Sequence, residues 1–181
     1  MSTENKDRIT CHVLDTSAGI PAKGLRITLS GPVAPPFPPP PSSSSSSAVA
    51  VNAPPLTATG NPPPPPVTHT FESTTDSDGR VKVWLPYSSA TSSGDIPVYT
   101  LEDVLGQASS SPSPDGSHEG AEGGPSTPQT WTLRFDTAGY FGGVEKTFFP
   151  EVSVTFTVMP RQRYHVPLLL SPYSYTTYRG S

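Results

Sequence analysis

Apolar and polar residues alternate with a period of two along most of the chain. In Arg8–Leu14 the apolar side chains of Ile9, Cys11 and Val13 share one side, as in a strand with one buried face. The same alternation recurs in Gly24–Ser30, Arg80–Leu85, Trp131–Asp136, Glu151–Val158, Tyr164–Leu170 and Tyr173–Tyr178, and more weakly in Val67–Ser73. Only Ala138–Lys146 fits a short helix. Seven or eight short strands separated by turn residues predict an all-β sandwich of two sheets.

Two low-complexity segments interrupt this pattern, at about residues 32–66 and 88–128. They hold many of the 25 prolines, including PVAPPFPPPP and NPPPPP, together with runs of serine and glycine. Such compositions bury too little apolar surface to offset the entropy of ordering the chain. We expect disordered insertions of coil and polyproline II, with a short helical turn at Thr100–Leu105. Residues 1–181 then form a single interrupted domain with roughly 105 foldable residues, a common domain size.

Charge and hydropathy exclude several classes of partner. The net charge is −4 without a basic patch, so nucleic acid is not an expected partner. No apolar run approaches the roughly 20 residues of a membrane span, and the polar start MSTENKDRIT does not resemble a secretory signal. The single cysteine suits a reducing compartment, and the ending RGS differs from the peroxisomal SKL address. We expect a cytoplasmic protein and keep the peroxisome as an alternative.

Four sequence blocks carry a more specific signal. They are ITCHVLDTSAGIPAKGLRITL near the start, TTDSDGR at Thr74–Arg80, FDTAGYFGGVEKTFFPEV at Phe135–Val152, and YHVPLLLSPYSYTTYRGS from Tyr164 to Ser181. In this order, and with YRGS at the end, they resemble the 5-hydroxyisourate hydrolases of the transthyretin-like family. The four blocks cover nearly all of the sequence outside the two low-complexity segments.

This resemblance implies a fold, an assembly and a reaction. The fold is a transthyretin-like sandwich, and the assembly is a homotetramer with active sites at the dimer–dimer interface. The reaction is hydrolysis of the lactam C–N bond of 5-hydroxyisourate, which makes the protein a cyclic amide hydrolase of urate degradation. The product is 2-oxo-4-hydroxy-4-carboxy-5-ureidoimidazoline. The resemblance implies neither a metal nor an organic cofactor.

The resemblance also implies which residues form the site. The family's catalytic set corresponds to His12, Arg80, His165 and Ser181 of this sequence. The family's substrate-binding residues correspond to Tyr178, Arg179 and Gly180. We expect the two histidines to position and deprotonate water, since the unperturbed histidine pKa is about 6.5. We expect Arg80 and Arg179 to bind and polarise a flat, polar substrate, with Ser181 or the terminal carboxylate orienting the set.

Strand parity gives a prediction that does not depend on the family. His12, Arg80 and His165 are each out of phase with the apolar residues of their own strands, although Leu169 shares the side of His165. All three should therefore project from the outer face of a sheet. Adjacent strand residues point to opposite faces, so Cys11 should pack in the core and not form a dyad with His12.

Other polar residues receive structural interpretations. Asp15 should cap the turn that follows its strand. His69 is assigned no role, and His118 lies in the second low-complexity segment.

Two other functions remain open. A transthyretin-type carrier of small ligands would use the same fold, but with a channel lined by apolar groups. The proline runs would instead suit an interaction module that binds SH3 or WW domains.

Overall fold

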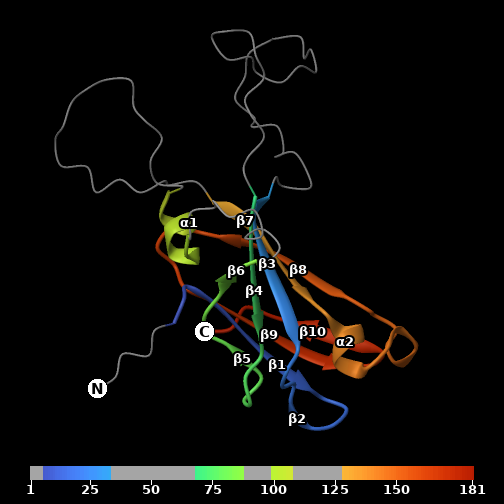
Figure 1. Ribbon diagram of the computed structural model, residues 1–181. Helices are drawn as coiled ribbons and strands as arrows, with labels where there is room; N and C mark the ends of the chain where they lie inside the picture. Colours follow the sequence, from blue (N-terminus) through green and yellow to red (C-terminus); the bar gives the residue numbers. More distant parts are fainter. Residues whose placement is uncertain (1–5, 34–67, 88–98, 108–127) are drawn as a thin grey trace, which may run out of the picture.

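The computed structural model describes residues 6–33, 68–87, 99–107 and 128–181 (Figure 1). Most of the two predicted insertions, with their proline runs and His118, lies outside the described residues. Pro32 and Val33 belong to a strand, and residues 99–107 lie within the range predicted for the second insertion.

The described chain is mostly β, as predicted. Its elements are β1 (Ile9–Asp15), β2 (Ile20–Pro21), β3 (Arg26–Val33), β4 (His69–Thr74), β5 (Arg80–Val81), β6 (Leu85–Pro86), α1 (Leu101–Gln107), β7 (Gln129–Phe135), α2 (Thr137–Phe141), the 3-10 turn η2 (Val144–Lys146), β8 (Val152–Val158), β9 (Tyr164–Ser171) and β10 (Ser174–Thr177). The predicted helix at Ala138–Lys146 corresponds to α2 and η2.

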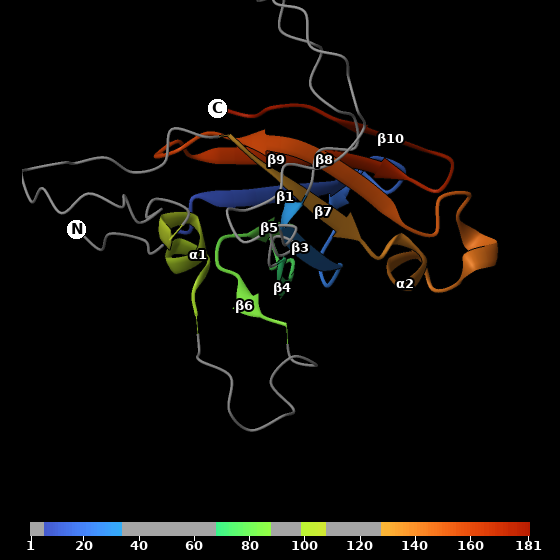
Figure 2. The ribbon, with the colours of Figure 1, turned by 90° about the horizontal axis from the view of Figure 1, so that it is seen from above.

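The strands form two sheets, which confirms the predicted sandwich. One sheet has the order β10-β9-β1-β2, with β5 also paired to β1, and the other has the order β6-β4-β3-β7-β8. Figure 2 shows β10, β9 and β1 in one layer, with β4 and β6 in the other. Strands β1 and β9 are parallel, although most of the chain separates them. No helix among the described residues is long and apolar enough to cross a membrane.

The core lies between the two sheets and follows the predicted alternation. Ile9, Cys11 and Val13 are fully buried, and so are Trp131, Leu133 and Phe135 on the opposite sheet. These side chains come from alternate positions of their strands, so each strand leaves its intervening residues on the outer face. The outer face of the β10-β9-β1-β2 sheet is therefore available for chemistry.

The predicted strand Arg80–Leu85 is wrong as a single element. Arg80–Val81 pairs with β1 in one sheet, whereas Leu85–Pro86 pairs with β4 in the other. The chain crosses between the sheets at residues 82–84, where the side chain of Trp84 fills the core and its Nε1–H donates to the carbonyl oxygen of Ile9 at 2.7 Å. Val83 and Leu85 are 43% and 63% exposed, because this crossing breaks the alternation that placed them beside Val81.

The helical turn expected at Thr100–Leu105 is present as α1 and joins the core. Leu101, Val104 and Leu105 are buried, which the composition of this segment did not predict. Glu102 of this helix accepts hydrogen bonds from the backbone N–H of Arg8 at 2.9 Å and from its Nε at 2.7 Å. The helix is thus tied to the start of β1, beside the face that carries the predicted site residues.

Candidate active site

His12, Arg80 and His165 come together on the outer face of the β10-β9-β1-β2 sheet, as their parity predicted. His12 and Arg80 are direct partners in the antiparallel pairing of β1 with β5. His165 lies on β9, which pairs with the other edge of β1. The rings of His12 and His165 have centroids 6.4 Å apart. Three residues far apart in sequence are therefore neighbours because β1 runs between β5 and β9.

A tight turn brings Arg80 to this face. The carboxylate of Asp76 accepts hydrogen bonds from the backbone N–H groups of Asp78 and Arg80, both at 2.9 Å. Gly79 has φ +72°, and an added Cβ would collide with the carbonyl oxygen of Val13. Glycine suits this position because the turn needs a positive φ and lies directly against β1.

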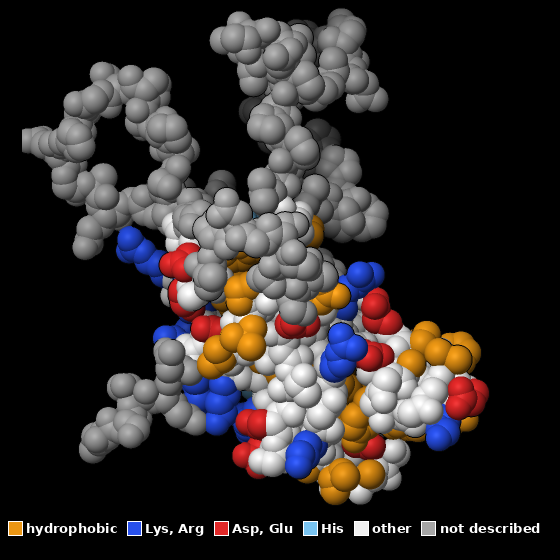
Figure 3. Space-filling view, viewed as in Figure 1, with side chains coloured by type: hydrophobic (Ala, Val, Ile, Leu, Met, Phe, Trp, Pro, Cys, Tyr) orange, Lys and Arg blue, Asp and Glu red, His pale blue; other side chains and the backbone are white. Residues whose placement is uncertain are grey.

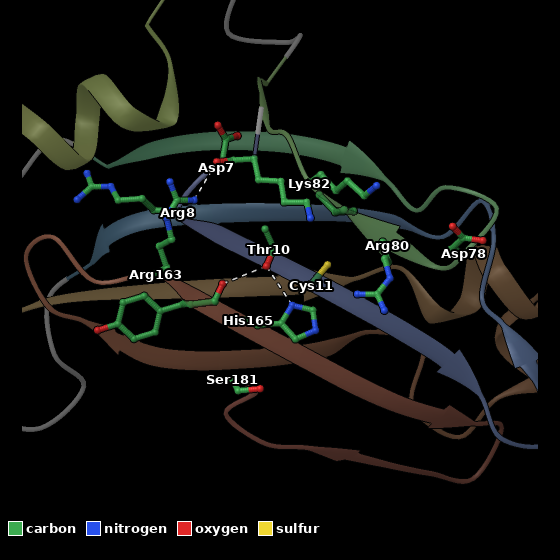
Figure 4. Close-up of a pocket in the computed structure, with 13 residues that line it drawn as sticks. Asp7, Arg8, Thr10, Cys11, Asp78, Arg80, Lys82, Arg163, His165 and Ser181 are labelled. Atoms are coloured by element: carbon green, nitrogen blue, oxygen red, sulfur yellow. Dashed lines mark hydrogen bonds between the residues drawn. The ribbon is translucent and has the colours of Figure 1, made fainter. Parts of the chain in front are cut away.

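Arg80, His165 and Ser181 share one cavity of about 480 Å³. Figure 4 shows the guanidinium of Arg80 on one side of the His165 ring and Ser181 below it. His12 does not line the cavity itself, but its ring neighbours that of His165 at the distance given above. The full lining is Lys6, Asp7, Arg8, Thr10, Cys11, Asp78, Arg80, Val81, Lys82, Arg163, Tyr164, His165 and Ser181.

Cationic side chains dominate the charge of this cavity. Lys6, Arg8, Arg80, Lys82 and Arg163 line it, against the carboxylates of Asp7 and Asp78, and Arg8 is also paired with Glu102 of α1. Figure 3 shows Lys and Arg side chains gathered at the side of the molecule where β1 and β5 lie. In a chain of net charge −4, this local excess of positive charge favours an anionic ligand.

His165 has the most distinctive electrostatic environment of the site. Its pKa is lowered, first by burial and then by the positive charges of Arg80 and His12. Its Nδ1 lies 3.0 Å from Oγ1 of Thr10. A neutral imidazole at neutral pH can accept a proton, so this environment suits a general base.

The last residues of the chain are divided between two cavities. The backbone N–H of Gly180 donates to the carbonyl oxygen of His165 at 2.8 Å, and Ser181 then reaches the first cavity. Tyr178 and Arg179 instead line a second cavity of about 440 Å³ that shares Tyr164 and His165 with the first. The guanidinium of Arg179 lies 5.2 Å from the centre of the Tyr164 ring. Within one chain, Tyr178 and Arg179 are therefore not directed at Arg80.

Two structural interpretations hold. Cys11 is fully buried, and burial raises the pKa of its thiol to about 12, so it packs in the core. Oδ1 of Asp15 accepts hydrogen bonds from Ser17 and from the backbone N–H of Ala18. Burial opposes ionisation of Asp15, but these bonds and one from Tyr140 leave its pKa below the ordinary value.

Thr10 and the cations Lys6, Lys82 and Arg163 were not predicted as site residues. Thr10 is two residues from His12 on the same strand, so the parity that selected His12 also placed Thr10 on the outer face. The cations gave no such signal, because their convergence depends on how β5 and β9 flank β1. Among the described residues, no three His, Cys, Asp or Glu side chains are grouped to hold a metal ion.

Comparisons with known proteins agree with the fold and with the sequence blocks. The chain is 27% identical over 176 residues to a probable 5-hydroxyisourate hydrolase of Schizosaccharomyces pombe, covering 96% of this chain and 90% of that protein. It is 33% identical over 179 residues to the uric acid degradation bifunctional protein TTL of Arabidopsis thaliana, but spans only 37% of that protein.

Solved structures and family models point the same way. Sea bream transthyretin in complex with thyroxine has a TM-score of 0.50 and 18% identity, covering 96% of this chain and 95% of that one, which supports the fold. The model of the HIUase/Transthyretin family matches residues 45–180. The chain therefore belongs to the HIUase/Transthyretin family.

Proposed function

We propose that this protein hydrolyses the lactam C–N bond of 5-hydroxyisourate, giving 2-oxo-4-hydroxy-4-carboxy-5-ureidoimidazoline in urate degradation. The observation that carries the proposal is the meeting of Arg80 and His165 on one cavity, with His12 beside them. The similarity to the Schizosaccharomyces pombe protein extends over nearly the whole chain and supports the same reaction. The protein acts as one domain, 1–181, interrupted at about 32–66 and 88–128.

The geometry suits addition of water to a cyclic amide. His165, neutral because its pKa is lowered, takes one proton of a water molecule as the water oxygen bonds to the carbonyl carbon. Negative charge develops on the carbonyl oxygen, and the guanidinium of Arg80 stabilises it. The C–N bond then breaks, and the departing nitrogen receives a proton from the imidazolium. His12 assists His165 in placing the water, and Ser181 orients the set from the opposite side of the cavity.

The charge of the cavity favours hydrolysis over the carrier function. A transthyretin-type carrier of small ligands is expected to line its site with apolar groups, whereas five cationic side chains line the cavity beside His165. Such a lining attracts a flat, anionic substrate and suits bidentate hydrogen bonding by arginine. The predicted substrate-binding roles of Tyr178, Arg179 and Gly180 remain part of the proposal, with Gly180 acting through its bond to His165.

An ultraviolet time course of freshly generated 5-hydroxyisourate tests the function. Urate oxidase produces the compound from urate, and catalytic amounts of this protein should accelerate its disappearance above the spontaneous rate. The acceleration should vanish in His12→Ala and Arg80→Ala. The matched control is Arg134→Ala on the opposite sheet, where Arg134 forms an exposed ion pair with Glu151. A folded wild-type protein that gives no acceleration would contradict the proposal and favour a carrier.

We propose a homotetramer with active sites at the dimer–dimer interface. Strand β10 is a sheet edge, and the exposed rings of Tyr173 and Tyr175 lie on or beside it. The outer face that carries His12 and Arg80 would then face a second dimer. Light scattering coupled to gel filtration should give about four times the 19.1 kDa of one chain. A monomeric mass for active protein would contradict this assembly.

We place the reaction in the cytoplasm, with the peroxisome as the alternative. The single cysteine, Cys11, is a buried free thiol, which suits a reducing compartment. A fluorescent fusion that leaves YRGS unblocked should fill the cytoplasm evenly, whereas a punctate pattern coinciding with a peroxisomal marker would favour the alternative.

Replacing Gly180 with alanine should displace His165. An added Cβ would lie 2.6 Å from Cδ2 of the His165 ring, whereas the backbone of Gly180 is in a conformation that alanine adopts freely. A shift of about 1 Å in a catalytic group costs on the order of 100-fold in rate. We therefore expect kcat to fall by about 10-fold to 100-fold, as measured in the ultraviolet assay, with little change in melting temperature.

The matched control is Gly106→Ala in α1. An added Cβ at Gly106 meets nothing within 4 Å, so kcat should stay unchanged. A Gly180→Ala protein as active as wild type would contradict the proposed placement of the chain end against His165.

A further inference from the structure

The hydroxyl of Thr10 bridges His165 and the backbone of β9. Thr10 lies opposite His165 in the parallel pairing of β1 with β9. Its Oγ1 is 3.0 Å from Nδ1 of His165 and 3.2 Å from the carbonyl oxygen of Tyr164 (Figure 4). The proposed catalytic set does not include Thr10, yet Thr10 touches the ring on which the reaction depends.

Counting protons decides the direction of the two hydrogen bonds. A hydroxyl carries one proton, and a carbonyl oxygen can only accept. If Oγ1 donates to the carbonyl oxygen of Tyr164, it can still bond to His165 by accepting from Nδ1–H. If Oγ1 donates to Nδ1 instead, the contact with the carbonyl oxygen is no longer a hydrogen bond. The first arrangement forms two hydrogen bonds and the second forms one, so the first is favoured at a part-buried position.

We propose that Thr10 is a positioning residue that fixes the neutral ring of His165 in the Nδ1–H tautomer, which leaves the Nε2 lone pair free to take a proton from water. In Figure 4 the second ring nitrogen lies on the side of the Arg80 guanidinium, where the substrate carbonyl would be polarised. The lowered pKa of His165 keeps the ring neutral and thus able to have a defined tautomer.

The proton balance of the reaction follows from this tautomer. Nε2 accepts a proton from water while the water oxygen bonds to the carbonyl carbon, and the imidazolium then carries a proton on each nitrogen. The proton on Nδ1 stays with Thr10, and the proton on Nε2 passes to the departing nitrogen. The opposite tautomer would present Nε2–H to the water and could not act as the base. This consequence rests on the proposed hydrolase function, whereas the tautomer does not.

Nitrogen-15 NMR of the imidazole rings tests the tautomer without any substrate. The chain has four histidines, and loss of one set of signals in His165→Gln identifies those of His165. At about pH 8.5, well above the ordinary histidine pKa of about 6.5, the wild-type ring should show the Nδ1–H tautomer. In Thr10→Val the population should move towards Nε2–H. A wild-type His165 already in the Nε2–H tautomer would overturn the proposal.

Kinetics test the consequence for catalysis. General-base catalysis contributes about 10²–10⁴-fold, and we expect Thr10→Val to lower kcat by about 10-fold to 100-fold with a smaller change in KM. Thr10→Ser, which keeps the hydroxyl, should recover most of kcat. Thr132→Val is the matched control, because it removes a strand hydroxyl that bonds to Thr155 on the other sheet. Equal kcat values for Thr10→Val and Thr10→Ser would overturn the positioning role.

The two proposals fail in different ways. Wild-type protein without any hydrolase activity would contradict the proposed function, whereas the NMR spectrum alone decides which tautomer Thr10 stabilises.

Discussion

Replacing His165 with glutamine is expected to lower kcat for 5-hydroxyisourate by about 10²–10⁴-fold, the usual contribution of a general base. Glutamine keeps a polar side chain of similar length beside Thr10 but cannot take a proton from water. Substrate contacts made by Arg80 remain, so KM should change much less than kcat. Steady-state kinetics in the ultraviolet assay measure both quantities.

His69→Gln is the matched control for His165→Gln. His69 lies on β4 in the opposite sheet, where it is half-buried against the ring of Tyr99. Burial lowers its pKa, as it does for His165, but no cationic side chain contributes to the shift. Full activity in His69→Gln together with full activity in His165→Gln would exclude His165 as the base.

Replacing Arg80 with glutamine is expected to lower kcat/KM by about 10²–10³-fold, the usual effect of losing one donor to a developing oxyanion. A second effect concerns pH. Arg80 lowers the pKa of His165, after burial and ahead of His12, so its removal raises that pKa. Activity requires neutral His165 and is lost as pH falls through its pKa. The acidic limb of the kcat/KM profile should therefore move to higher pH in Arg80→Gln.

Arg80→Lys separates charge from geometry. Lysine keeps the positive charge, so the acidic limb should stay near its wild-type position, while the planar pair of donors is lost and kcat/KM still falls. An acidic limb that does not move in Arg80→Gln would show that Arg80 does not act on His165. Wild-type kcat/KM in Arg80→Lys would contradict recognition by the guanidinium fork.

The period-two pattern was sufficient to predict the sandwich and the face that carries the site. It placed Ile9, Cys11 and Val13 in the core and His12 on the outer face, because a strand alternates its side chains regardless of its neighbours. The parity of Arg80 was predicted for the same reason. These predictions needed only local geometry.

Features that depend on tertiary contacts were not predictable in the same way. The chain leaves one sheet after Val81 and enters the other at Leu85, and this crossing is set by Trp84 in the core. The burial of Leu101 depends on the packing of α1 beside the start of β1, where Glu102 bonds to Arg8, and this contact exists only in the folded sandwich. The position of Arg179 over Tyr164 likewise follows from the path of the chain after β10.

The parallel pairing of β1 with β9 has a consequence for folding kinetics. All seven residues of β1 pair with β9, and Thr10 and His165 are separated by 155 positions in the sequence. Closing so long a loop is among the slower steps of folding, since non-local contacts must first offset the entropy of closure. His12, Thr10 and Arg80 can come together earlier, but His165 joins them only when this loop closes. During refolding, hydrolytic activity should therefore return only with the slowest structural phase, the pairing of β1 with β9. The return of activity would then mark the completion of folding.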